Sequence, residues 1–497
     1  MNRQIRLLAV GLLVCYAALF IKLNILQVGE SKQLSTDPRN DRAVIQTFNK
    51  PRGPIMSADG VVLASSVATP TEKFKFQRQY PTGDLFSDVT GYYSFTYGAT
   101  QVEKVENAIL AGTTTQQQVG ALGNIFTKDT NTTGSVTLTL RNDLQTVAKT
   151  ALGDREGSVV VLDPRTGAIL AMYSYPSYDP NQVADHDSVA AANALAVMNA
   201  DGRKPLLANA YQERYMPGST FKMLTVSAAL ESGTVTTATT FPSERQFLPP
   251  QTTDPILNFA GELCGGTLAV SFARSCNTAF ARVAVGMGPQ AWIDGVGKFG
   301  VNNEAVPIDL PGAAKSTIGT PAFLATLPQN IPLLGIGGFG QGNDSITPLQ
   351  MAMVGATIAN GGVEMKPFAI ANTKDFNGNI LSQTAPTPWR SPISAATSAI
   401  VTQLMIGVVQ TGTAKCCLKL DGGIQAAAKT GTAQLNATGQ PPRSHAWIVA
   451  FAPAEAPRYV VAVMLKGVND QISAGTGGTL AGPIARQMLN AALAIPQ

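Results

Sequence analysis

Apolar residues are spread unevenly along this chain, and their densest run lies at its beginning. Arg3 and Arg6 are followed by Leu7–Ile21, fifteen residues without a charge, and after Lys22 the apolar character continues to Val28. A helix of about 20 apolar residues spans a bilayer, and a lysine near its end can reach the interface. This pattern predicts a transmembrane helix.

We expect this helix to remain as an anchor. A cleaved signal peptide is the alternative, but residues 24–31 contain no Ala-x-Ala type of cleavage motif. The basic residues before the apolar run keep the short first segment in the cytoplasm, so the rest of the chain is expected outside. The predicted location is the plasma membrane, with a single pass and an extracytoplasmic body.

The pattern changes after the anchor. Residues 31–135 are polar and rich in turn formers such as Pro51–Pro54 and Ala58–Gly60, while short apolar runs such as Val61–Leu63 are typical of strands. The polar stretch Lys128–Ser135 indicates a linker. We therefore predict a first, strand-rich domain in this region.

Strand and helix patterns then follow each other. Alternation predicts a strand over Val136–Leu140, and a helix over Leu144–Leu152 capped by Asn142 or Asp143. Further apolar runs predict five strands, the first two joined by a hairpin turn: Val159–Leu162, Ile169–Met172, Ala426–Gln434, Ala446–Ala452 and Tyr459–Lys466.

These strands lie at the two ends of the second region, while its Ala-rich middle, about 185–410, has a mostly helical period. A last helix is expected over Thr479–Leu493. This order predicts an α+β fold, with one antiparallel sheet built from both ends and covered by helices. The expected organisation is a cytoplasmic tip and anchor in 1–30, a first domain in 31–135 and a second in 136–497.

Composition narrows the class of protein. Hydrophobic residues make up 45% and charged residues 14%, against the ~25% charged residues of typical soluble domains, which excludes long charged tails and most disorder. Lysine and arginine exceed aspartate and glutamate by 36 − 32 = 4. So small a net charge gives no indication of a nucleic-acid partner.

The five cysteines give little sign of a metal site, because no C-x-x-C pair occurs and neither histidine lies near a cysteine in the sequence. Cys264 and Cys276 form a disulfide or remain two buried thiols, and the pairing of Cys416 and Cys417 stays open. We expect neither a metal nor a cofactor.

The first candidate for chemistry is the pair Ser219 and Lys222. It follows the break at Pro217-Gly218 and opens a run that is apolar on nearly all sides, as in a core helix. At this spacing both side chains lie on one helix face. A serine hydroxyl needs a base to become a nucleophile, and a lysine serves only when burial or a second cation keeps it uncharged. The alternative is a capping serine with an exposed lysine.

Two further motifs complement this pair. In Ser275-Cys276-Asn277, Ser275 can relay a proton and Asn277 can bind a peptide carbonyl, although a helix cap is an equally simple interpretation. Lys429-Thr430-Gly431-Thr432 lies on a predicted strand, where Lys429 can be the second cation, the threonines can hold a carboxylate, and Gly431 lets a substrate backbone approach. An ordinary edge strand is the alternative.

In this order S-x-x-K, S-x-N and K-T-G occur together in β-lactamases and penicillin-binding proteins. The chain resembles a class B penicillin-binding protein of the actinobacterial PbpA type, a monofunctional D,D-transpeptidase. Other segments carry the resemblance along nearly the whole chain: Arg52–Ile55 with Asp59-Gly60 and Leu63-Ala64, Leu138–Leu140 with Leu144-Gln145, Asp163–Ala171, and Gly340–Gly342 with Thr347–Gln350.

The resemblance implies a pedestal domain, then a transpeptidase domain with a serine β-lactamase-like fold. It also implies roles. Ser219 is acylated by the penultimate D-Ala of a stem peptide, Lys222 is the general base, Ser275 relays the proton and Asn277 orients the peptide. The carboxylate of D-Ala or of a β-lactam binds to Lys429, Thr430 and Thr432, and the backbone amides of Ser219 and Thr432 form the oxyanion hole. The implied partners are stem peptides, a cell-wall glycosyltransferase and proteins of elongation or division.

Other functions use the same site. A D,D-carboxypeptidase results if water replaces the attacking amine, a β-lactamase if deacylation is fast, and a non-catalytic sensor if the site only binds β-lactam or wall peptide. Two other features are discounted. Gly335–Gly340 fits the G-x-G-x-x-G motif of dinucleotide-binding sites. Such a site needs a strand before the motif and a helix directly after it, and the sequence predicts neither. His445, on the strand of Trp447, is expected to have a structural role at the surface.

Overall fold

The computed structural model describes residues 2–25, 47–70, 74–122, 132–436, 440 and 443–495. Val28 and the first half of the expected linker Lys128–Ser135 lie outside them. The chain forms two compact units, one with residues 1–51 and 66–77, the other with residues 52–65 and 78–497.

The first unit contains helix α1 (Asn2–Asn24). Its segment Arg3–Asn24 is 22 residues long with a mean hydropathy of 2.1, so it is long and apolar enough to cross a membrane, as predicted. None of this segment is buried inside the structure.

A six-stranded sheet in the order β15-β14-β6-β1-β2-β3 forms the strand-rich region. Its strand β6, at the predicted 136–140 position, pairs in parallel with β1 and antiparallel with β14, so this sheet combines strands from both predicted domains. The bounds are β1 Ile55–Met56, β2 Val62–Ala68, β3 Phe76–Gln79, β6 Ser135–Leu138, β14 Ile370–Lys374 and β15 Ile380–Gln383. The helices of this region are α4 Ser87–Thr90, α5 Gln101–Val105, α6 Asn107–Ala111 and α7 Thr115–Leu122.

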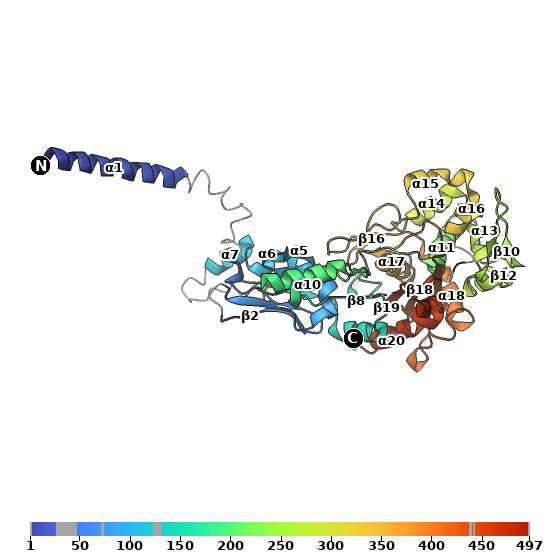
Figure 1. Ribbon diagram of the computed structural model, residues 1–497. Helices are drawn as coiled ribbons and strands as arrows, with labels where there is room; N and C mark the ends of the chain where they lie inside the picture. The colour runs from blue at the N-terminus through green and yellow to red at the C-terminus, as the bar shows by residue number, and fades with distance from the viewer. Residues whose placement is uncertain are drawn as a thin grey trace. The chain divides into compact units, whose positions relative to one another are not determined.

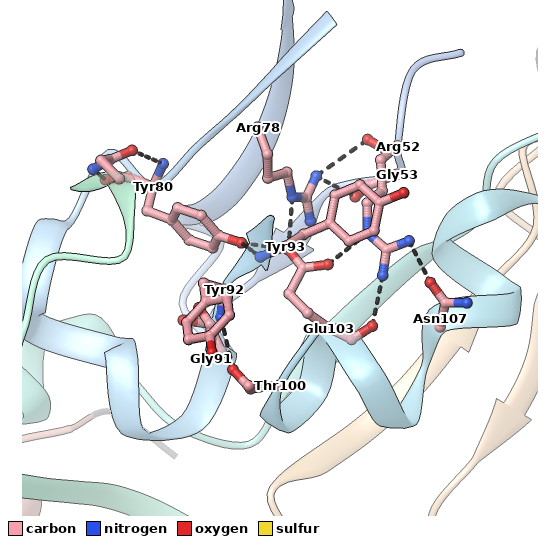
Figure 2. Close-up of polar contacts among 12 residues, drawn as sticks. Arg52, Gly53, Arg78, Tyr80, Gly91, Tyr92, Tyr93, Thr100, Glu103 and Asn107 are labelled. Carbon is pink, nitrogen blue, oxygen red and sulfur yellow. Dashed lines mark hydrogen bonds and ion pairs between the residues drawn. The ribbon is translucent and has the colours of Figure 1, made fainter. Parts of the chain in front are cut away.

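A buried ionic network lies beside this sheet (Figure 2). Glu103, on α5, is fully buried and receives the Nε–H groups of Arg52 at 2.5 Å and Arg78 at 2.7 Å. Tyr80 donates its hydroxyl to the same carboxylate at 3.0 Å, and Arg52 also donates to Asn107. Burial favours a higher pKa for Glu103, but the charges of Arg78 and Arg52 outweigh burial and lower it.

The predicted antiparallel sheet, built from both ends of the second region, is confirmed. Five antiparallel strands run in the order β17-β18-β19-β7-β8, so strands from the end of the chain pair with strands from residues 157–175. Every residue of β18 and β19 is buried, which explains their unbroken apolar runs. The bounds are β7 Gly157–Leu162, β8 Ile169–Tyr175, β17 Ala427–Gln434, β18 Ser444–Ala452 and β19 Tyr459–Leu465.

Helices cover both faces of this sheet (Figure 1). Helices α8 and α20 pack together on one face, while α11, α17 and α18 form the layer on the other. Their bounds are α8 Asn142–Leu152, α11 Lys222–Glu231, α17 Pro348–Ala359, α18 Ala395–Gln410 and α20 Gly482–Leu493. Further helices are α9 Asn181–Ala184, α10 Ser188–Ala200, α12 Leu268–Ala273, α13 Asn277–Met287, α14 Pro289–Gly297, α15 Pro321–Thr326, α16 Ile331–Gly337 and α19 Asp470–Ser473.

The middle of the chain is less uniform than its helical period indicates. It also contains short paired strands, β9 Thr240–Glu244 with β12 Cys264–Thr267, β10 Gln246–Phe247 with β11 Ile256–Leu257, and β13 Glu364–Met365 with β16 Pro388–Arg390. These strands are two to five residues long, too short for a period-2 pattern to stand out from the surrounding Ala-rich sequence.

The predicted cap of α8 was wrong. Asn142 and Asp143 lie inside the helix, and their amides donate to the carboxylate of Asp59, at 2.8 and 3.2 Å. Asp59 belongs to the turn between β1 and β2, more than 80 residues earlier. This carboxylate therefore satisfies two N-terminal amides that the residue before the helix, Arg141, leaves unbonded.

Candidate active site

Ser219 lies on a short turn that leads into a buried helix. The turn is η4 (Gly218–Phe221), and α11 continues it from Lys222. Gly218 has φ +54°, and its amide donates to Gly340 O at 2.9 Å. A Cβ at Gly340 would lie 2.1 Å from the oxygen of Gly218, so only glycine allows this contact. Two glycines thus fix the turn that presents Ser219.

The amine of Lys222 is buried between the turn and the S-x-N motif. The side chain has no exposed surface, and Nζ donates to Ser275 O at 2.6 Å and to Asn277 Oδ1 at 2.8 Å. The hydroxyl of Ser275 lies 3.2 Å away, and the rings of Phe280 and Phe339 complete the enclosure at 5.4 and 5.8 Å from their centroids.

Burial lowers the pKa of Lys222 well below its usual value, and the charge of Lys429 lowers it further. In its uncharged form, which this shift favours, the amine has two hydrogens, which match the acceptors on Ser275 and Asn277, and one lone pair. Lys429 lies where the sequence analysis expects a second cation, and its role toward Lys222 remains a prediction. The arrangement therefore encloses a lysine whose pKa is lowered inside the protein.

Ser219 is half-buried, and among the described residues its hydroxyl has no hydrogen-bond partner. The spacing of three residues places it on the same helix face as Lys222. Hydrogen bonds of catalytic groups are often long or misaligned in free enzymes and tighten once substrate binds. Ser219 is thus partly exposed and one turn away from a desolvated amine.

Ser275 holds its hydroxyl between the two amines. It follows α12, and its φ of +62° lies in the left-handed region, which a residue other than glycine seldom adopts. Its Oγ accepts a hydrogen bond from Lys429 Nζ at 2.8 Å and contacts Lys222 Nζ at 3.2 Å. Such strain is typical of functional sites, and here it accompanies a hydroxyl that bridges two amines.

Asn277 begins helix α13, and its side chain is held at both ends. Its oxygen accepts from Lys222, and its nitrogen donates to Leu257 O at 3.2 Å. Between Ser275 and Asn277, Cys276 forms a disulfide with Cys264 of β12, which resolves the alternative that the sequence left open. The adjacent cysteines Cys416 and Cys417 are also bonded to each other.

The K-T-G motif lies on β17, which is the edge strand of the central sheet. Lys429 is fully buried and donates to Ser275 Oγ and, at 2.9 Å, to Thr430 O. Burial lowers its pKa to about 7. A Cβ at Gly431 would lie 2.8 Å from Pro217 O, so this glycine lets β17 approach the turn of Ser219. Its expected role was toward a substrate backbone, which remains a prediction.

The two threonines of this motif are held by other loops. Thr430 is nearly buried and shares a hydrogen bond with the hydroxyl of Thr413, while Thr432 is half-buried and accepts from Gly477 N at 3.3 Å. Trp447, which pairs with Gly431 on the next strand, donates its indole N–H to Met216 O at 3.0 Å. These bonds connect β17 and β18 to the neighbouring loops.

The three sequence motifs are brought into one hydrogen-bonded cluster. Sequence reasoning missed the residues that complete it, namely Phe280, Phe339, Thr413 and Trp447. Their positions come from segments far apart in the chain, and of their surroundings the sequence analysis noted the Gly340–Gly342 segment next to Phe339 only as part of the family resemblance.

The two discounted features have structural explanations. Gly335 and Gly337 lie inside helix α16, and Gly340 packs against the turn of Ser219, so this glycine run shapes the site. His445 is structural, as expected, but the surface position was wrong: it is buried, and its Nδ1 accepts from Gly467 N at 3.0 Å. Burial lowers its pKa to about 4. In the described part of the chain no three acidic, cysteine or histidine side chains cluster as metal ligands.

Comparison with known proteins identifies the family. The family model of the penicillin binding protein transpeptidase domain matches residues 157–490, and that of the penicillin binding protein A dimerisation domain matches residues 52–136. Two relatives named peptidoglycan D,D-transpeptidase PbpA come from Mycolicibacterium smegmatis, at 37% identity, and Mycobacterium tuberculosis, at 36%. Each alignment covers 99% of this chain and 99% of the relative.

Solved structures agree. The penicillin G acyl-enzyme complex of penicillin-binding protein A from M. tuberculosis superimposes with a TM-score of 0.81 at 35% identity, over 89% of this chain and all of that chain. The chain therefore belongs to the penicillin-binding protein transpeptidases. Within this class it is a serine-type peptidoglycan D,D-transpeptidase, as the resemblance implied.

Proposed function

We propose that Ser219 is the nucleophile that forms an acyl-enzyme with the stem peptide. The observation that carries the proposal is the fully buried amine of Lys222, whose pKa is lowered by burial and by Lys429, one helical turn from a half-buried serine whose hydroxyl has no partner among the described residues. Lys222 takes the hydroxyl proton as Ser219 Oγ bonds to the carbonyl carbon of the penultimate D-Ala.

The proton must then reach the leaving group. Ser275 contacts Lys222 Nζ at 3.2 Å and accepts from Lys429 Nζ at 2.8 Å, so its hydroxyl can pass a proton from Lys222 to the departing D-Ala amine as the peptide C–N bond breaks. Asn277, whose side chain is held by Lys222 and Leu257, orients the peptide through its amide. The amides of Ser219 and Thr432 stabilise the oxyanion.

The K-T-G motif recognises the carboxylate. Lys429 supplies positive charge beside the cleft, and Thr430 and Thr432 supply hydroxyl donors, while the peptide lies along the edge strand at Gly431. An amine from a second stem peptide then attacks the ester, gives up its proton through the same groups and restores the Ser219 hydroxyl. A β-lactam carries the same carboxylate and acylates the same oxygen.

The anchor sets where this reaction takes place. We propose that α1 crosses the plasma membrane once, with Arg3 and Arg6 in the cytoplasm and the catalytic region outside. The enzyme then acts next to a cell-wall glycosyltransferase that supplies new strands, and with proteins of elongation or division. Export of the body as one extracytoplasmic region would also permit the Cys264–Cys276 disulfide to form.

A labelled penicillin tests the nucleophile and separates the alternatives. Wild-type protein should hold the label for many minutes, Ser219→Ala should take none, and Ser188→Ala, an exposed serine on α10, should label normally. Rapid release would indicate a β-lactamase, and an unlabelled wild type a non-catalytic sensor. Labelling of Ser219→Ala would reject the assignment of this serine.

The response to an acceptor amine distinguishes a transpeptidase from a D,D-carboxypeptidase. Wild type is incubated with a donor stem peptide and with a second peptide that carries a free amine. A cross-linked product should form, and its yield should rise with the concentration of the amine. Free tetrapeptide alone at every amine concentration would indicate a D,D-carboxypeptidase.

A further inference from the structure

Thr413 lies outside the three motifs and yet contacts two of them. It follows helix α18, and its exposed side chain shares a hydrogen bond with the hydroxyl of the nearly buried Thr430. Its backbone amide donates to Ala273 O at 3.2 Å, two residues before Ser275. One residue thus connects the strand of the K-T-G motif with the segment that carries the S-x-N motif.

The segment around Thr413 also adjoins the loop that holds Thr432. A Cβ at Gly478 would lie 2.4 Å from the carbonyl oxygen of Thr413, so the two backbones are in direct contact. The neighbouring Gly477 donates its amide to Thr432 Oγ1. The two threonine hydroxyls of the K-T-G motif are therefore each bonded by one of two loops that pack against each other.

The bond between the two hydroxyls has two possible directions. Each threonine hydroxyl donates one hydrogen and accepts others. If Thr430 donates to Thr413, it has no hydrogen left for a ligand in the cleft. If Thr413 donates, the hydrogen of Thr430 is free for an acceptor, and the chain of two hydroxyls is polarised toward it. A carboxylate only accepts, so its binding selects the second direction.

We propose that Thr413 is a positioning residue for recognition of the substrate carboxylate, acting by orienting the Thr430 hydroxyl. The proposal rests on the proposed function, because the ligand is the carboxylate of the acylating peptide or β-lactam. Thr413 itself need not touch that carboxylate. Its effect reaches the ligand through one hydrogen bond, and its amide keeps the S-x-N segment at a fixed distance from β17.

Thr413→Val removes the hydroxyl at nearly constant volume. We expect the second-order rate constant of acylation by labelled penicillin to fall about tenfold, the effect of one hydrogen bond that supports a charged ligand. Thr413→Ser keeps the hydroxyl and should stay near wild type. Thr411→Val changes an exposed threonine that bonds Gly407 O at the end of α18, and it should leave the rate unchanged.

A double-mutant cycle tests whether Thr413 acts through Thr430. In the Thr430→Val background, Thr413→Val should cause no further loss. The penicillin methyl ester, which lacks the charge, should acylate Thr413→Val and wild type at similar rates when each is measured by competition with the label. Independent losses in the cycle, an equal loss for the ester, or full activity of Thr413→Val would each overturn the proposal.

The melting temperature of each variant is measured alongside. If Thr413→Val does not fold, Thr413→Ala takes its place in the same cycle, because it removes the hydroxyl without adding volume. Failure of this proposal would leave the labelling of Ser219 intact, whereas failure of the proposed function would appear as normal labelling of Ser219→Ala. The two failures are therefore distinguishable.

Discussion

At the scale of single residues, the site depends on two buried lysines that an apolar core normally excludes. Lys222 and Lys429 have no exposed surface, and Ser275 lies between their amines. Burial lowers the pKa of both, and their mutual repulsion adds to the effect at Lys222. Burying two amines lowers the stability of the fold, and the proposed function of Lys222 as a base gives a reason for this loss.

Replacing the base should remove most of the activity. In Lys222→Met we expect acylation of Ser219 by penicillin to slow by about 10²- to 10⁴-fold, the usual contribution of a general base. Lys298→Met, at an exposed lysine after α14, is the matched control and should react normally. Time courses of labelling give both rates, and a loss smaller than tenfold would contradict the role of Lys222.

The pH profile tests the state of that lysine. An amine with an ordinary lysine pKa of 10.5 would make the acylation rate rise about tenfold per pH unit from 7 to 10. Since burial and the charge of Lys429 lower the pKa of Lys222 well below 10.5, we expect this rise to level off well below pH 10. A steady tenfold gain per unit in wild type would contradict an uncharged base.

Stability should respond to Lys429 in a pH-dependent way. The folded pKa is about 7 and the unfolded value 10.5, so between these values the unfolded state binds the extra proton. Burial of Lys429 therefore destabilises the fold increasingly as pH falls from 10.5 to about 7, and by a constant amount below. Lys429→Met should melt higher than wild type at pH 7, with a difference that shrinks toward pH 10.5. A difference independent of pH would contradict this.

The sequence predicts the reactive residues better than their surroundings. Ser219, Lys222 and Lys429 belong to short motifs, where a local spacing carries the chemistry. The aromatic enclosure of Lys222 by Phe280 and Phe339 and the bond from Thr413 to Thr430 arise only when distant segments meet. The left-handed backbone of Ser275 has no sequence signal either, because serine seldom adopts it.

At the scale of elements, long buried strands are predictable and short ones are not. The strands β7, β18 and β19 are covered on both faces. Because nearly every side chain in them is buried, their sequences are continuous apolar runs that can be recognised without the structure. The two-residue strands β10 and β11 depend on pairing with each other, which no local pattern encodes. The cap of α8 was missed for the same reason, since Asp59 reaches it from a distant turn.

This distant cap should contribute measurably to stability. In Asp59→Ala the amides of Asn142 and Asp143 lose their acceptor, and we expect a loss of about 1 kcal/mol, which is typical of a helix cap. Asp143→Ala removes an exposed carboxylate paired with Arg141 and should cost less. Chemical denaturation of both variants gives the comparison, and equal losses would contradict the capping role of Asp59.

At the scale of the whole molecule, a second buried charge cluster holds the region before the catalytic residues together (Figure 2). Arg52 and Arg78 share the single carboxylate of Glu103, and further bonds go to the carbonyl oxygens of Arg52, Gly53 and Glu103 and to the side chain of Asn107. None of these residues lies in the catalytic motifs. A substitution in this cluster should therefore change the stability of the protein without changing the groups that react with penicillin.

Removing its central charge should destabilise the protein and leave the chemistry intact. Glu103→Gln leaves two buried arginines without a counter-charge, and we expect a loss of about 3 kcal/mol. Because the pKa of Glu103 is lowered in the folded state, its ionised carboxylate stabilises the wild-type fold. This stabilisation is fully present above pH 4.5 and is lost as the pH falls through the folded pKa. The difference in melting temperature between the two proteins should be smaller at pH 3 than at pH 7, while well below the melting temperature Ser219 still takes penicillin. An unchanged melting temperature at pH 7 would contradict it.

The central claim is that one hydroxyl, Ser219, is acylated because Lys222 is an uncharged base next to it. Peptide mass spectrometry of the penicillin adduct tests this most directly, with wild type and Lys222→Met treated for the same short time. The account predicts one adduct, on the peptide and side chain of Ser219 in wild type, and almost none in Lys222→Met. An adduct on any other residue, or equal modification of both proteins, would contradict it.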